Sequence, residues 1–243
     1  AYMRSVILCE GQTDAILLSY YLGRVYDWKP LKRQPTNCFI TVDSQNQDVN
    51  WYKKADDELL ICAVDGNTNF GSFYHNKIER PIIDSDAFQK LVVMTDHDRN
   101  TIETIEKSVN DAIWGEAAYF KNGMWTEATY YNSFDEEKKL QVLLKVIPKQ
   151  YEGALETVML DAISEDPYDK EIVDRCKTFI DEIRPFAEKY INRDRLALKA
   201  KLSATWAVQS PEKVFRFIDQ QIRMVAWENS TVLKSCFAEL SEI

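Results

Sequence analysis

The chain has 243 residues, of which 45% are apolar and 28% charged, and its formal net charge is -9. These values are ordinary for a globular protein with one large domain, or one domain with an appendage. The negative charge argues against a protein that coats nucleic acid through bulk electrostatics, but not against an enzyme that meets phosphates through divalent ions. We find no bilayer-length apolar run and no signal peptide, so we expect a cytoplasmic protein without a membrane segment.

The cysteine and histidine residues indicate neither a disulfide framework nor a zinc site. The five cysteines are scattered and form no Cys-x-x-Cys pair, and the two histidines have no histidine partner four residues on. We therefore expect buried thiols in a reducing compartment. The cysteines are Cys9, Cys38, Cys62, Cys176 and Cys236, and the histidines are His75 and His97.

The first elements in chain order are a strand, an acidic turn and a helix. Residues 5–9 form a short apolar run, and residues 15–22 read as an apolar helix that ends at Gly23. In the turn between them, Thr13 or Asp14 is a candidate helix cap. Glu10 follows the buried strand directly, where a carboxylate is costly unless it is paired or binds a cation.

The polar region that follows gives weaker signals. We expect a short strand over residues 39–42 and a surface loop over residues 45–50. Residues 59–64 read as a second buried strand, with Asp65 at its end. Residues 70–83 predict a helix, or a loop and a helix, broken at Pro81.

The central element is the apolar run of residues 91–94, which predicts a strand buried on both faces. Asp96 and Asp98 follow it, and residues 102–113 then show helical spacing. Two carboxylates at positions i and i+2 are hard oxygen ligands that suit Mg²⁺ or Mn²⁺. The alternative is an ordinary turn, in which aspartate and asparagine are also favoured.

The remaining chain begins with an aromatic stretch and then becomes helical. We expect a hairpin around Asn122-Gly123, and a strand or short helix over residues 140–147. A helix over residues 153–163 carries Glu156 in its first turn, where an acid also favours the helix dipole. Further helices are expected over residues 172–183, 193–206, 211–227 and 232–240. We place an α/β core at residues 1–165 and a helical extension packed on it at residues 166–243.

Acidic side chains thus follow three of the predicted strands. Glu10 and Asp14 come after the first, Asp65 after the second, and Asp96 and Asp98 after the central one. If the strands are parallel, their carboxyl ends lie on one edge of the sheet. Carboxylates gathered there repel one another without a cation, whereas two divalent ions clamp the oxygens of a phosphodiester. The pattern therefore predicts a Rossmann-like α/β fold that transfers or hydrolyses phosphoryl groups.

The residues that carry these acids also resemble a known family. Residues 6–14, Val-Ile-Leu-Cys-Glu-Gly-Gln-Thr-Asp, and residues 92–98, Val-Val-Met-Thr-Asp-His-Asp, resemble a Toprim domain. The resemblance implies that Glu10, Asp96 and Asp98 bind Mg²⁺. Asp14 and Glu156 are more similar to the OLD-nuclease branch, where such carboxylates help to hold a second metal ion and a downstream lysine assists.

For that lysine, Lys199 and Lys201 are the candidates, although a solvated helix face is the ordinary role of lysine. The stretch from residue 153 to 163 is also similar to small, stand-alone bacterial Toprim proteins. The chain departs from the OLD pattern because it carries no ATPase domain, and it carries no zinc-binding or primase module.

Three functions follow from these observations. The first is a Mg²⁺- or Mn²⁺-dependent nuclease acting on DNA or RNA, with Glu10, Asp96, Asp98 and Lys199 as catalytic residues. Its metal ligands would be Glu10, Asp14, Asp96, Asp98 and Glu156. The second is a non-catalytic module that works with a separate ATPase in phage defence. The third is another phosphotransferase, although the Gly66–Gly71 stretch lacks the lysine of a phosphate-binding P-loop. The oligomeric state is left open.

Overall fold

The computed structural model describes residues 2–213 and 218–243, and its chain divides into two compact units. The first comprises Ala1–Glu152 together with Ala238–Ile243, and the second comprises Gly153–Phe237. This division falls after residue 152, whereas composition suggested residue 165. The last six residues belong with the first unit, although the sequence analysis placed them in the helical extension.

The first unit contains a seven-stranded sheet with the strand order β2-β3-β4-β1-β5-β7-β6. The strands are β1 (Arg4–Cys9), β2 (Lys29–Pro30), β3 (Asp48–Lys54), β4 (Asp57–Ala63), β5 (Lys90–Asp96), β6 (Thr126–Tyr131) and β7 (Glu137–Ile147). The four central strands, β4, β1, β5 and β7, are parallel, while β2, β3 and β6 pair antiparallel at the two sides. The α/β class is therefore confirmed, with a sheet that is parallel in its centre and mixed as a whole.

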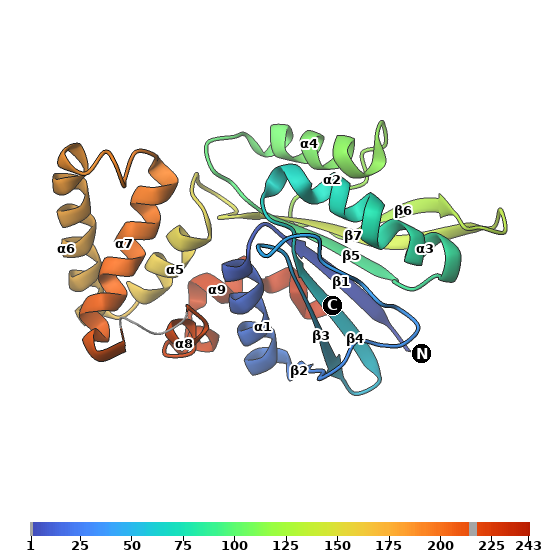
Figure 1. Ribbon diagram of the computed structural model, residues 1–243, viewed down its shortest axis with the longest axis horizontal. Coiled ribbons are helices and arrows are strands. Elements are labelled where there is room, and N and C mark those ends of the chain that lie inside the picture. Colours follow the sequence, from blue (N-terminus) through green and yellow to red (C-terminus); the bar gives the residue numbers. More distant parts are fainter. Residues whose placement is uncertain (1, 214–217) are drawn as a thin grey trace. The chain divides into compact units, whose positions relative to one another are not determined.

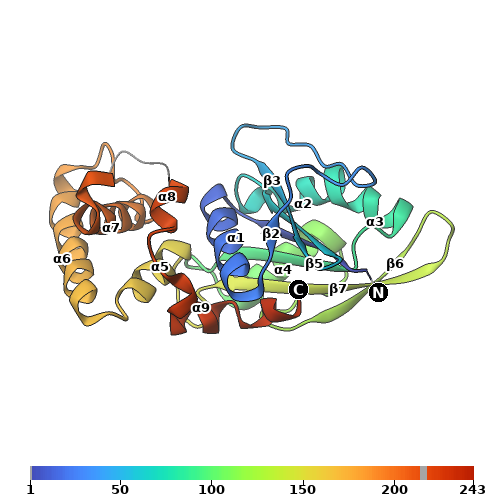
Figure 2. The ribbon, with the colours of Figure 1, turned by 90° about the horizontal axis from the view of Figure 1, so that it is seen from below.

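Helices cover both faces of this sheet, with α1 on one face and α2, α3 and α4 on the other (Figures 1 and 2). Their bounds are α1 (Gln12–Tyr26), α2 (Phe70–Phe73), α3 (Glu79–Ser85) and α4 (Ile102–Trp114), with shorter turns η1 (Asn67–Asn69), η2 (Tyr74–Ile78) and η6 (Ala238–Glu242). Because both faces are covered, the central strands are apolar at successive positions rather than alternating with polar residues.

The main core lies between the sheet and the α2–α4 side. Alternate residues of the central strands, such as Val6, Leu60 and Val93, are fully buried there, and they pack with residues of α2 and α4 such as Phe70 and Val109. The spacing of two along each strand places these side chains on one face. The intervening strand residues are also buried, so every β1 residue is buried.

The order of the parallel strands places a switch point between β1 and β5. In chain order these strands are β1, β4, β5 and β7, but in space they lie as β4-β1-β5-β7. The chain leaves β1 through α1 on one face, and it leaves β5 through α4 on the other face (Figure 1). In open α/β sheets, ligands bind outside the carboxyl ends of the strands at such a position.

Two expectations for the polar region were wrong. Residues 39–42 are not a strand, because the side chain of Gln34 satisfies both backbone groups of Ile40 and takes the place of a strand partner. The strand begins instead at Asp48, within the stretch read as a surface loop. Its signal was the alternation of Val49 and Trp51 with polar residues, and Trp51 is buried in the core.

The two predicted helix breaks are also absent. Helix α1 passes through Gly23 and ends at Tyr26, where Asp27 adopts a left-handed conformation. Pro81 lies inside α3 rather than ending it. A proline cannot bond to the carbonyl four residues before it. The wider π-helical turn η2 directly precedes α3, and in it the amide of Glu79 bonds to the carbonyl of Tyr74. This wider turn accommodates the proline within the helix.

The hairpin lies further along the chain than predicted. Around Asn122-Gly123 the structure has two isolated bridges, Lys121 with Met124 and Asn122 with Leu144, and no hairpin strands. The hairpin strands are β6 and β7, and the side chain of Asn132 organises their turn by accepting from the amides of Phe134 and Glu136. Residues 140–147, which the sequence left open between strand and helix, belong to β7.

The described part of the second unit is helical. Its helices are α5 (Leu155–Ile163), α6 (Pro167–Ile183), α7 (Asp194–Gln209), α8 (Ile218–Ile222) and α9 (Thr231–Cys236), with short turns η3 (Arg184–Phe186), η4 (Pro211–Lys213) and η5 (Trp227–Asn229). The helices expected over residues 172–183 and 193–206 are confirmed. The one expected over residues 211–227 lies partly outside the described residues. Over residues 2–213 and 218–243, no helix is long and apolar enough to span a bilayer.

Candidate active site

Glu10 joins the carboxyl ends of three parallel strands. It follows β1, and its carboxylate oxygen Oε1 accepts hydrogen bonds from the Thr95 hydroxyl at 2.5 Å and from the Asp96 amide at 2.9 Å. Its backbone carbonyl accepts from the amide of Gly66, just beyond β4, at 2.8 Å. Glu10 is therefore oriented by residues far away in the sequence, at the switch point between β1 and β5.

Asp96 and Asp98 lie at the end of the neighbouring strand. Asp96 is the last residue of β5 and is 5% exposed, while Asp98 is partly buried. Asp98 has a φ of +47°, in the left-handed region that aspartate tolerates better than most residues. The residue between them, His97, donates its backbone amide to the carbonyl of Ile147 on β7 at 2.7 Å. The predicted meeting of Glu10 and Asp96 at one edge is confirmed.

Asp14 has a structural role in this arrangement. It lies in the first turn of α1, and its Oδ2 accepts from the amide of Gly11 at 2.8 Å, as in a capping box. Such a bond satisfies an amide that has no partner within the helix. Asp14 thus contributes to the cap from the third helical position, whereas the N-cap residue itself is Gly11 and not Thr13 or Asp14 as predicted. Metal binding by the Asp14 carboxylate stays a prediction.

Asp65 follows β4 and its side chain is exposed, with φ at +70°. Its carboxylate lies 3.4 Å from the hydroxyl of Ser44 and 3.4 Å from the side-chain amide of Asn46. The side chain therefore turns toward the loop that precedes β3. Of the predicted acidic residues, Asp65 is consequently the least suited to be a metal ligand at the site.

Glu156 and Lys199 meet within the second unit. Glu156 is 4% exposed in the first turn of α5, and Lys199 on α7 donates to its Oε1 at 2.7 Å. Arg195 lies one turn before Lys199, with its guanidinium 3.7 Å from Oε2 of Glu156. The buried carboxylate thus faces two cations. The roles that the Toprim resemblance implies for Glu156 and Lys199 stay predictions.

The carboxylates near the end of β1 affect the pKa of the neighbouring Cys9 thiol. Burial raises the pKa of Cys9 well above its ordinary value, and the nearby carboxylates of Asp14 and Glu10 raise it further. The Cys9 thiol is consequently neutral, and it donates to the backbone carbonyl of Cys62 at 3.2 Å. All five cysteines are buried, as expected.

The donor chemistry of this edge fits a hard divalent cation. Glu10, Asp96 and Asp98 offer carboxylate oxygens, which Mg²⁺ and Mn²⁺ prefer. Among the residues that the structure describes, no group of three or more His, Cys, Asp or Glu side chains is arranged to hold a metal ion. Mg²⁺ commonly keeps several waters and binds one or two carboxylates together with substrate phosphates, so the residues present fit such a weakly held ion.

Sequence reasoning missed Thr95, whose hydroxyl orients Glu10. Thr95 is 5% exposed, and it directly precedes the Asp-x-Asp pair at the end of an otherwise apolar strand. A buried hydroxyl needs a hydrogen-bond partner, so its place among apolar residues was the available signal. The partner itself, 85 residues earlier in the chain, could not be foreseen.

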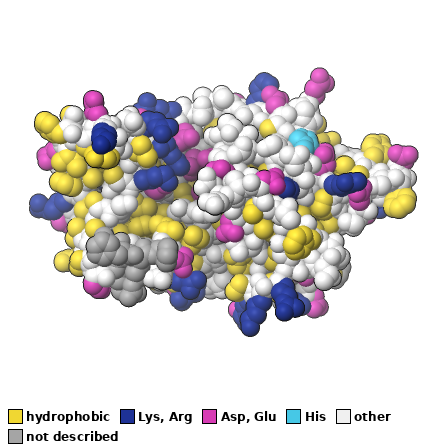
Figure 3. Space-filling model, viewed as in Figure 1, with side chains coloured by type: hydrophobic (Ala, Val, Ile, Leu, Met, Phe, Trp, Pro, Cys, Tyr) yellow, Lys and Arg dark blue, Asp and Glu magenta, His cyan; other side chains and the backbone are white. Residues whose placement is uncertain are grey.

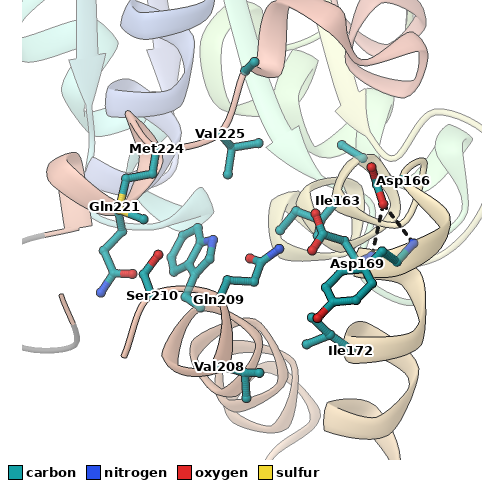
Figure 4. Close-up of a pocket in the computed structure, with 14 residues that line it drawn as sticks. Ile163, Asp166, Asp169, Ile172, Val208, Gln209, Ser210, Gln221, Met224 and Val225 are labelled. Atoms are coloured by element: carbon teal, nitrogen blue, oxygen red, sulfur yellow. Dashed lines mark hydrogen bonds between the residues drawn. The ribbon is translucent and has the colours of Figure 1, made fainter. Parts of the chain in front are cut away.

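A separate hollow of about 560 Å³ lies within the second unit, and none of the predicted site residues lines it (Figure 4). Its walls come from the start of α6, the end of α7 and residues 221–226. Asp166 at its rim accepts from the amides of Tyr168 and Asp169 and caps α6. That carboxylate is therefore already used in capping the start of the helix.

The face drawn in Figure 3 carries charged side chains of both signs among hydrophobic and uncharged ones. Binding that relies on phosphate charge uses clustered lysine and arginine residues.

The fold and the site together define an α/β protein in which Glu10 meets the end of β5 at the switch point of its sheet. The family model described as "Protein of unknown function (DUF3226)" matches residues 4–235, and the chain belongs to this family. No curated protein matches the sequence. Among solved structures, the crystal structure of a hypothetical protein from Pyrococcus horikoshii OT3 is similar at 12% identity and a TM-score of 0.49, covering 98% of this chain and 95% of that chain.

Proposed function

We propose that the protein is a divalent-cation-dependent phosphodiesterase that cleaves nucleic acid at Glu10, Asp96 and Asp98. The observation that carries the proposal is the contact of the Glu10 carboxylate with Thr95 and the Asp96 amide. It brings two carboxylate residues, 86 positions apart, to the switch point of a parallel sheet. Ligands bind at this place in open α/β folds.

Each residue has a defined part in this proposal. Asp96, at the buried end of β5, and Asp98, in the turn that follows, would hold the cation. Glu10 would either hold it too or exchange a proton with the leaving oxygen, and Thr95 keeps its carboxylate in place for both roles. A bound Mg²⁺ or Mn²⁺ would supply charge stabilisation at the phosphate and lower the pKa of a bound water.

The acidic charge of the site indicates how a phosphate substrate would bind. Carboxylates without a cation repel phosphate, so substrate binding should require the divalent ion and weaken without it. The net charge of -9 does not favour a long, sequence-independent contact with a duplex. The resemblance to Toprim nucleases supports DNA or RNA as the substrate. A separate ATPase partner belongs to the second candidate, the non-catalytic module.

Cleavage assays test the proposal directly. Labelled DNA, tRNA and other RNA are incubated with the protein and Mg²⁺ or Mn²⁺, and Glu10→Gln and Asp96→Asn are compared with wild type. Asp135→Asn is the matched control, because it removes one charge from the turn at the amino end of β7, opposite the proposed site. We expect cleavage by wild type and the control only. Cleavage by all four proteins, or by none, would overturn the proposal.

The same variants separate the two roles of Glu10. If Glu10 transfers a proton, Glu10→Gln abolishes cleavage but binds Mn²⁺ as tightly as wild type. If it is a ligand, Mn²⁺ affinity falls together with cleavage. Titration of Mn²⁺ followed by electron paramagnetic resonance of the free ion gives the affinity in both cases.

A second candidate is a non-catalytic module with the same fold. It is favoured by the absence, among the described residues, of a group of three metal-binding side chains, and by the use of Asp14 as a helix cap. Such a module need not bind divalent ions at the edge. Calorimetric titration with Mg²⁺ discriminates between the enzyme and the module. A heat of Mg²⁺ binding that is present in wild type and absent in Asp96→Asn favours the enzyme.

A further inference from the structure

His97, between the two aspartates, is connected to β7 by two hydrogen bonds. Its backbone amide donates to the carbonyl of Ile147 at 2.7 Å, and its ring nitrogen Nδ1 lies 3.1 Å from the carbonyl of Pro148. The residue is 8% exposed although histidine is polar. A buried ring with a fixed partner indicates a role other than that of a solvated turn residue.

The chemistry of the ring contact fixes the state of the imidazole. A carbonyl oxygen can only accept, so Nδ1 must carry the hydrogen. This contact lies just beyond the sheet, since the pairing of β5 with β7 ends at Asp96 opposite Ile147. The ring therefore extends the connection between these two strands by one residue, into the turn that holds Asp98.

We propose that His97 is a positioning residue, which fixes the Asp96–Asp98 turn to the end of β7 through its Nδ1–H. Loss of the ring contact would remove one of the two His97 hydrogen bonds to the end of β7, next to Asp98 with its left-handed φ of +47°. The attachment itself needs no metal ion. Its consequence for cation affinity rests on the proposed function.

Three substitutions at His97 distinguish the roles of its two ring nitrogens. His97→Asn places a side-chain N–H near the position of Nδ1, His97→Gln places one near Nε2, and His97→Ala places none. We expect Mn²⁺ affinity to fall about 10- to 100-fold in the alanine and glutamine variants, as for lost outer-shell contacts. The asparagine variant should stay within about threefold of wild type. Thermal unfolding confirms that each variant is folded.

Amide hydrogen exchange gives a readout that does not depend on the metal. Without divalent ions, the amide of His97 should exchange faster in the alanine and glutamine variants, and at the wild-type rate in the asparagine variant. Nitrogen chemical shifts of the wild-type ring should show the hydrogen on Nδ1. If wild type binds no Mn²⁺, the proposed function fails, while the exchange rates still decide the role of His97.

Two results would overturn the inference. Wild-type exchange and affinity in His97→Ala would mean that the ring does not position the turn. Wild-type affinity in His97→Gln but not in His97→Asn would mean that Nε2 contacts the cation itself, which makes His97 a ligand.

Discussion

The Thr95 hydroxyl lies 2.5 Å from the Glu10 carboxylate, so a side chain at the end of β5 orients the acidic group that follows β1. Thr95 is 5% exposed, and its hydroxyl would otherwise be buried without a partner. This contact ties together the two strands that form the switch point.

Removing this hydroxyl should disturb the site without removing a charge. We expect Thr95→Val to lower the free energy of unfolding by about 1–2 kcal/mol, because it breaks a bond to a carboxylate. We also expect about a tenfold loss of Mn²⁺ affinity, since Glu10 loses its support. Urea unfolding and Mn²⁺ titration measure the two effects. Thr95→Ser keeps the hydroxyl and should match wild type. Unchanged affinity in Thr95→Val would remove Thr95 from the site.

Asp14→Asn should separate capping from metal binding. The amide oxygen of asparagine can still accept from Gly11, so the free energy of unfolding should change by less than about 0.5 kcal/mol. If the carboxylate also binds a cation, as the Toprim resemblance implies, Mn²⁺ affinity falls in the same variant. Asp14→Ala provides the comparison, with an expected loss of about 1 kcal/mol for the cap. Wild-type affinity in both variants would leave Asp14 with the cap alone.

Lys145 on β7 is fully buried, and its ammonium lies 2.6 Å from the carboxylate of Glu239 in η6. Glu239→Ala should lower the free energy of unfolding by about 3 kcal/mol, because it leaves a buried ammonium without its carboxylate. Lys149→Met removes the more exposed partner of the same carboxylate, so it should cost less than about 1 kcal/mol. Denaturant unfolding measures both. Equal losses in the two variants would contradict this account.

The same ion pair should make stability depend on pH. Burial opposes ionisation of Glu239, but the hydrogen bonds from Lys145 and Lys149 outweigh it and lower its pKa below the ordinary 4.5. A carboxyl with a lowered folded pKa stabilises the protein above its unfolded pKa and loses this effect as pH falls. The difference in unfolding free energy between wild type and Glu239→Ala should therefore shrink between neutral pH and about pH 3. A constant difference would argue against the pair as its source.

Within the second unit, the buried carboxylate of Glu156 should make Lys199 important for stability. Lys199→Met removes its 2.7 Å partner, and we expect a loss of about 1–3 kcal/mol. Lys201→Met on the same helix is the control, because its partner Asp181 is exposed and such pairs contribute less than about 1 kcal/mol. Adding Glu156→Gln to Lys199→Met should recover most of the loss. A failure to recover would point to another role for Lys199.

The sequence alone determined those strands and helices whose apolar residues follow a regular spacing. The apolar runs at residues 5–9, 59–64 and 91–94 correspond to β1, β4 and β5, and helices α1, α4, α6 and α7 follow from their apolar spacing. The expectation that Glu10 and Asp96 meet was also within reach, because the carboxyl ends of parallel strands share one edge. Local periodicity reports which side chains are buried, and so it could identify these elements.

Only the tertiary structure decided which side chains touch one another. Three contacts join residues far apart in the sequence. Thr95 bonds to Glu10 across 85 positions, His97 to Pro148 across 51, and Lys145 to Glu239 across 94. The position of the hairpin became clear only from the pairing of β6 with β7. A polar side chain that is expected to be buried needs a hydrogen-bond partner, and the sequence can show this need. The identity of the partner depends on the fold, because a hydrogen bond forms only where donor and acceptor are brought together.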